Sequence, residues 1–176
     1  MYRIVIVLIV SFIGLSAFSV PERVQKKADK VISKHFDLDD YSKEYIRVSA
    51  SENKATPSGF TEDNFFRILD NGKHIAYGYI GNAPSKTATF DYIVIFDIDF
   101  IITKSAVLVY REEYGGEISS TRWLKQFTGS SSTSPELKYN QDIIPISGAT
   151  ISVRSMTKAM NDLLKSIRIL KDMDTI

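Results

Sequence analysis

The chain has 176 residues, enough for one domain with a sizeable core and too few for two. Its 22 Lys and Arg residues nearly balance its 21 Asp and Glu residues, and the scattered basic residues do not predict a nucleic-acid surface. The absence of cysteine excludes disulfides, thiolate metal sites, iron–sulfur clusters and a cysteine nucleophile. His35 and His74 each lack a second ligand at helical or hairpin spacing, so no metal site is expected.

The N-terminal segment has the pattern of a secretory signal. Arg3 gives a positive start, and residues 4–18 are almost entirely apolar or small. Ala17 and Ser19 are small residues at the two positions that a signal peptidase reads. The run is shorter than the ~20 residues that a membrane-spanning helix needs, which favours a cleaved signal over a permanent anchor. We expect residues 1–20 to be a signal peptide or N-terminal anchor, and the protein to be exported to the periplasm or cell envelope.

A polar helix and a loop are expected next, over residues 21–62. Residues 21–36 have one apolar stripe between charged residues, which predicts an amphipathic helix. That stripe consists of Val24, Ala28, Val31 and Ile32. Residues 49–61 are rich in Ser, Asn, Thr, Pro and Gly, and this composition predicts a loop.

The middle of the chain has the composition of β-strands. Residues 65–69 and 74–80 flank Asn71-Gly72, and Asn-Gly between two such runs is a strong hairpin signal. Residues 90–96 and 100–110 are rich in Ile, Val, Tyr and Phe, as expected of central strands. These runs predict an antiparallel sheet.

Two helices are expected after the strands. Residues 120–127 predict a short one. Residues 152–170 have apolar residues recurring every three or four positions, as on the buried face of a long helix. An antiparallel sheet with packed helices makes the predicted fold class α+β, in one domain.

The segment before the last predicted helix is the strongest candidate site. Ser147, Gly148, Ala149 and Thr150 form a small-residue turn that feeds a helix N-terminus, where free N–H groups and the helix dipole favour anions such as phosphate. Ser152 adds a hydroxyl in the same region. The alternative is that the Ser or Thr is an ordinary N-cap, which would be worth about 1 kcal/mol.

The sequence Ser147-Gly-Ala-Thr150-x-Ser152 resembles the flavinylation motif of the FMN-binding domain family. That family includes the periplasmic G subunit of the Rnf electron-transport complex and the C subunit of the sodium-pumping NADH:quinone oxidoreductase. The resemblance implies that Thr150 carries FMN as a phosphoester, installed by a flavin transferase. It also implies that Ser147, Gly148 and Ala149 shape the phosphate cradle, within an FMN-binding domain over residues 63–176.

Two further segments support the resemblance, which extends over roughly residues 65–165. Residues 110–115 stand in the place of a family His-x-Glu-Thr-Pro-Gly segment, and residues 123–129 in the place of a helix with Trp and Phe-x-Gly. The chain departs from the family pattern at four positions. Tyr110 replaces the His, Glu113 and Tyr114 stand at the usual Thr and Pro, and Ile144 occupies a position that is often Asp.

Trp123, Glu112 and Gly115 are further candidates for the flavin site. Trp123 could stack on the isoalloxazine ring, and its alternative role is that of a half-buried core aromatic. Glu112, beside the turn at Gly115, could meet the polar edge of the flavin, and its alternative role is that of a solvated acid.

The function favoured by these features is an exported FMN carrier that passes electrons between a redox partner, such as a membrane electron-transport complex, and another exported protein. No nicotinamide fingerprint and no Arg/His cluster for a dicarboxylate is evident in the sequence. One alternative is an exported flavin-dependent oxidoreductase that reduces a small substrate directly. The other is a flavin-free structural or assembly module of the same fold.

Overall fold

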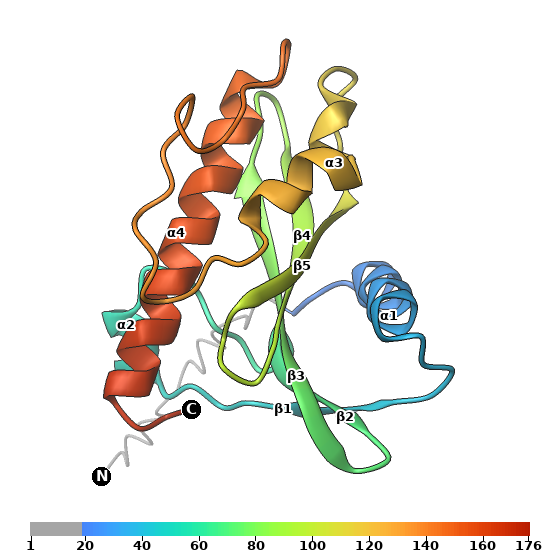
Figure 1. Cartoon of the computed structure of the whole chain (residues 1–176), viewed down its shortest axis with the longest axis vertical. Helices are drawn as coiled ribbons and strands as arrows, with labels where there is room; N and C mark the ends of the chain where they lie inside the picture. Colours follow the sequence, from blue (N-terminus) through green and yellow to red (C-terminus); the bar gives the residue numbers. More distant parts are fainter. Residues whose placement is uncertain (1–18) are drawn as a thin grey trace, which may run out of the picture.

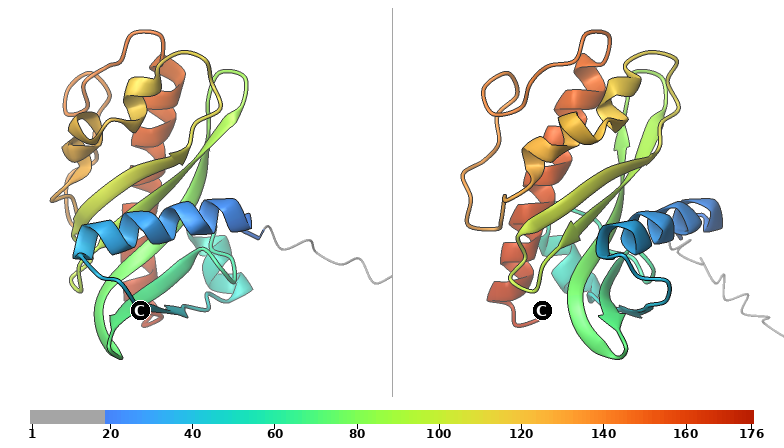
Figure 2. Two further views of the ribbon diagram at one scale, coloured as in Figure 1. Left: turned by 90° about the vertical axis from the view of Figure 1, so that its right-hand side faces the viewer. Right: turned by 45° about the vertical axis from the view of Figure 1, so that its right-hand side comes forward.

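A computed structural model describes residues 19–176, and the predicted signal at residues 1–18 lies outside them (Figure 1). A five-stranded antiparallel sheet in the order β1-β2-β3-β4-β5 forms the centre of the molecule, with helices on both faces (Figure 1, Figure 2). The fold is therefore α+β, as predicted. The strands are β1 (Ser42–Tyr45), β2 (Phe65–Asp70), β3 (Lys73–Pro84), β4 (Thr89–Phe96) and β5 (Ile102–Val109). The helices are α1 (Glu22–Phe36), α2 (Ala50–Ala55), η1 (Gly116–Ser119), α3 (Thr121–Leu124), η2 (Lys125–Phe127) and α4 (Thr150–Asp172).

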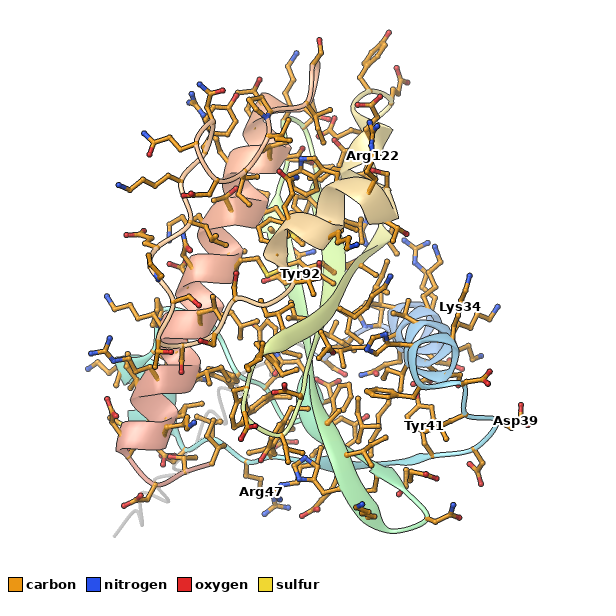
Figure 3. The ribbon with its side chains drawn as sticks, viewed as in Figure 1. Lys34, Asp39, Tyr41, Arg47, Tyr92 and Arg122 are labelled. Atoms are coloured by element: carbon orange, nitrogen blue, oxygen red, sulfur yellow. The ribbon has the colours of Figure 1, made fainter. Side chains whose placement is uncertain are left out.

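The sheet is covered on both faces, so the central strand β4 is buried from Phe90 to Phe96. Along β4, Tyr92, Val94 and Phe96 belong to the core on the α4 side, whereas Ile93 and Ile95 belong to the core on the α1 side. Successive side chains of a strand point to opposite faces, which explains the split. Figure 3 shows Tyr92 on the α4 side of the sheet and Tyr41 on the α1 side.

Helix α1 confirms the predicted amphipathic stripe. Val24, Ala28 and Ile32 are fully buried against the sheet. Strand β1 was not predicted, and it pairs with β2 from Ser42 to Tyr45, so the N-terminal segment contributes a strand to the sheet. The limits predicted for the domains, 21–62 and 63–176, remain predictions.

The β2–β3 hairpin forms at the predicted Asn-Gly turn. Asn71 and Gly72 both have positive φ, 47° and 79°, as a tight two-residue hairpin turn requires.

The predicted loop over residues 49–61 is wrong in its first half, which is helix α2. Ser49 caps this helix: its hydroxyl accepts from the N–H of Glu52, and the Glu52 carboxylate accepts from the N–H of Ser49. This reciprocal capping box satisfies two backbone donors and favours a helical turn in a polar segment.

Candidate functional site

Helix α4 begins at Thr150, two residues earlier than predicted. Gly148 has a φ of +75°, which glycine tolerates without strain, and Ala149 is the N-cap residue. Thr150 is therefore the first residue of the helix itself, and its side chain is exposed.

No side chain caps the N-terminus of α4. The alternative reading of the motif as an ordinary Ser or Thr cap is therefore wrong, because the N-cap is alanine. The first N–H groups of a helix have no acceptor within it. Those of Thr150, Ile151 and Ser152 thus stand at the positive end of a 23-residue helix, where an anion is favoured.

This N-terminus lies in a pocket of about 340 Å³, within the range of small-molecule sites. Three parts of the chain line it: the loop between β3 and β4, the segment after β5, and the turn with the first residues of α4. The lining residues are Lys86, Tyr110, Glu112, Tyr114, Gly148, Ala149, Thr150, Ile151 and Ser152. Ser147 is exposed in the same turn.

Gly115 packs directly against two residues that line the pocket, Gly148 and Ala149. Its φ is +76°, and a Cβ added there would lie 2.3 Å from the Cβ of Ala149 and 3.3 Å from the carbonyl oxygen of Gly148. The backbone after β5 thus touches the turn before α4 directly. The small residues Gly115 and Ala149 are required by this close approach of two chain segments.

Tyr110 joins the end of β5 to the first turn of α4. Its hydroxyl lies 3.1 Å from Oγ of Ser152, which is 2 % exposed. The Tyr110 ring also packs edge-on against Phe90, with ring centroids 6.0 Å apart. The residue at the usual family His position therefore fixes the helix end to the sheet.

Glu112 holds the β3–β4 loop closed. Its carboxylate accepts hydrogen bonds from the Ser85 hydroxyl at 2.6 Å, from the Thr87 N–H at 2.6 Å and hydroxyl at 2.8 Å, and from the Ala88 N–H at 3.1 Å. These donors, led by Ser85, lower the pKa of Glu112 to about 2. Glu112 is therefore ionised and engaged with its own loop, so it is not the freely solvated acid of the alternative reading. It also lines the pocket, and its contact with the flavin stays a prediction.

Lys86 belongs to the same loop and is exposed at the pocket. It is the one cationic side chain among the lining residues. The sequence does not indicate Lys86 as a site residue, because a lone lysine in a polar loop gives no signal of its own. Tyr114, 76 % exposed, and Ile151, 48 % exposed, are apolar lining residues that were also missed as site residues. Their exposure beside a pocket marks them in the structure, and no pattern in the sequence predicts it.

Trp123 is not brought to this pocket. It is 6 % exposed, its indole N–H donates to the carbonyl of Ile144 at 2.8 Å, and its ring packs edge-on against Phe127. It lines a separate pocket of about 510 Å³ together with Ile144 and Gln126. The structure thus gives Trp123 the alternative role of a core aromatic.

Residues 86–165 match the family model of the FMN-binding domain. The chain contains an FMN-binding domain. The match begins at Lys86 in the pocket loop and ends within α4, so it includes every residue that lines the pocket. No curated protein matches the chain significantly.

The residues of the pocket fit FMN. The uncapped N–H groups at Thr150 and the two residues after it, with the ammonium of Lys86, are donors suited to a phosphate. Gly148 leaves the backbone open, since a Cβ there would have no neighbour closer than 3.9 Å. The FMN-binding domain and this donor set support FMN as the cofactor of a flavoprotein.

Proposed function

We propose that the FMN-binding domain carries its flavin covalently on Thr150, and that the exported chain is an electron-transfer carrier. One observation carries the covalent assignment: Thr150 is an exposed residue in the uncapped first turn of α4, inside the pocket of the FMN-binding domain. A phosphoester at its hydroxyl would place the phosphate at the positive end of the helix.

Each residue around Thr150 has a distinct part in this proposal. The N–H groups of Ile151 and Ser152 would stabilise the phosphate, and Lys86 would offset its negative charge. Tyr110 fixes the start of α4 through Ser152, so that these donors keep their direction. Tyr114 and Ile151 would offer apolar surface to the ring system of the flavin.

Bound FMN would supply one- and two-electron redox chemistry. The pocket favours a carrier over an enzyme, because Lys86, the one cation among its lining residues, would be used by the FMN phosphate and none would be left for an acidic substrate. A covalent cofactor also suits an exported protein, which cannot replace a lost flavin from a cytoplasmic pool.

Export rests on the signal pattern of residues 1–20. The partners would be a flavin transferase and a redox partner, such as a membrane electron-transport complex. No helix within residues 19–176 is long and apolar enough to cross a membrane.

Intact mass after denaturation tests the attachment. The protein is produced with its flavin transferase in an exporting host, as wild type, Thr150→Val and Thr150→Ser. Valine keeps the shape of threonine without the hydroxyl, whereas serine keeps the hydroxyl. We expect an added mass of one FMN less one water in the wild type and in Thr150→Ser, and none in Thr150→Val.

The other outcomes separate the remaining functions. A yellow wild type that loses its colour on denaturation, with no added mass, would refute covalent attachment and leave a non-covalent flavoprotein. A colourless wild type would favour a flavin-free module. Steady-state reduction of a small substrate by the loaded protein would favour an oxidoreductase, since a carrier exchanges electrons only stoichiometrically.

A further inference from the structure

The backbone nitrogen of Val20 is held by Asp63, and neither residue lines the flavin pocket. The Val20 N–H donates to Oδ2 of Asp63 at 2.8 Å, and the Ser19 hydroxyl donates to the same oxygen at 2.7 Å. The other carboxylate oxygen accepts from the Thr61 hydroxyl at 2.9 Å. The Val20 side chain is 8 % exposed and packs into the core on the α1 side. Residue 20 is thus fixed both by its nitrogen and by its side chain.

The Ser19–Val20 bond is also the bond that the small residues Ala17 and Ser19 mark for a signal peptidase. We infer that the peptidase hydrolyses this bond and that Asp63 binds the new α-ammonium group of Val20. The inference rests on the proposed export. Water adds across the peptide bond, so that Ser19 leaves with a carboxylate and Val20 keeps the nitrogen. That nitrogen already lies beside Asp63 before cleavage.

The position of this new charge explains why an acid is needed there. Helix α1 begins at Glu22 after Pro21, and no side chain caps it. An ammonium just before a helix N-terminus faces the positive end of the helix dipole, which is unfavourable. Asp63 supplies the opposite charge, and the three N–H donors of the ammonium can replace the bond lost with Ser19.

The position of Asp63 relative to α1 is itself fixed. Its backbone carbonyl accepts from the side-chain amide of Gln25 at 2.9 Å. The carboxylate therefore does not depend on Ser19 for its placement, and it remains in position when residues 1–19 are removed.

The reactivity of the terminal amine tests this pairing. The full-length gene is expressed in an exporting host, the exported protein is purified, and intact mass gives its first residue. The α-amine is then acylated near pH 7, and its rate is compared with that of a free peptide of residues 20–24. We expect a first residue of Val20 and an acylation rate about tenfold below that of the peptide, because pairing with a carboxylate raises the pKa of the ammonium and leaves less free amine.

Two variants separate charge pairing from simple shielding of the amine. Asp63→Asn should bring the rate back toward that of the peptide, whereas Glu62→Gln, the adjacent exposed acid, should leave it low. If Asp63→Asn does not fold, the pH dependence of the wild-type rate decides: pairing moves the midpoint of acylation above that of the peptide, whereas shielding lowers the rate at every pH. An equal rate in protein and peptide would overturn the inference.

The identity of the first residue of the exported protein is a second test, and it concerns the cleavage site. An exported chain that keeps residues 1–19, or that begins at another residue, would overturn the processing while leaving export intact. A full-length chain retained inside the cell would overturn both. The flavin mass on Thr150 is an independent measurement in each case.

Discussion

Alanine at Gly115 should disrupt the flavin pocket, whereas alanine at the adjacent Gly116 should not. The Cβ built at Gly115 lies 2.3 Å from that of Ala149, and carbon atoms in contact are about 3.5 Å apart, so the two segments must separate by roughly 1 Å. Overpacking of this kind costs about 1–3 kcal/mol, and a φ of +76° adds about 1–2 kcal/mol for an L-residue. Lower entropy of the unfolded chain offsets about 0.4–1 kcal/mol. The net loss in the free energy of unfolding is about 1–4.5 kcal/mol.

Gly116 is a matched control because it is the adjacent glycine, and it lacks both features that make Gly115 sensitive. A Cβ there would meet nothing within 4 Å, and its φ is not positive. Gly116→Ala should change the free energy of unfolding by less than about 1 kcal/mol, on the stabilising side. Urea unfolding of both variants measures the difference, at matched flavin loading.

Flavin loading gives the second measurement on the same pair. At a temperature where both variants are folded by circular dichroism, Gly115→Ala should incorporate less FMN, because it displaces the turn at Ala149 and the start of α4. Equal stability and equal loading in the two variants would refute the contact between these segments and the support it gives to the site.

Three other predictions follow from the pocket and the core. The amide NMR signal of Thr87 should report the titration of the Glu112 carboxylate, with an apparent pKa of about 2. A midpoint near 4.5 would refute the hydrogen bond between the Thr87 N–H and Glu112. Since this pKa is lower in the folded state, the carboxylate stabilises the fold above pH 4.5, and that contribution is lost as the pH falls from about 4.5 to 2. In the Thr150→Val background, which cannot bind FMN covalently, Lys86→Met should weaken the binding of free FMN by about 1 kcal/mol, or roughly fivefold. The difference should be smaller in high salt, which screens the charge of Lys86. A Kd that fluorescence shows to be unchanged would exclude Lys86 from the phosphate site. Ile32→Ala should lower the free energy of unfolding by about 2–5 kcal/mol in urea, and a loss below 1 kcal/mol would mean that α1 is not part of the cooperative fold.

The sequence by itself determined the features that depend on neighbouring residues. The stripe containing Val24 and Ala28 predicted α1, and Asn71-Gly72 predicted the β2–β3 hairpin, because periodicity and turn conformation are local properties. The motif ending at Thr150 indicated the FMN-binding domain for the same reason: its small residues and helix start are contiguous in the chain.

Only the tertiary structure decided which distant segments meet. It placed Gly115 against Ala149, brought Lys86 into the pocket, and kept Trp123 out of it. It also engaged Glu112 with its own loop. These contacts depend on how the sheet packs against α4 and on where each loop leaves the sheet. Such contacts join residues far apart in the chain, and no periodicity or spacing in a single sequence records them.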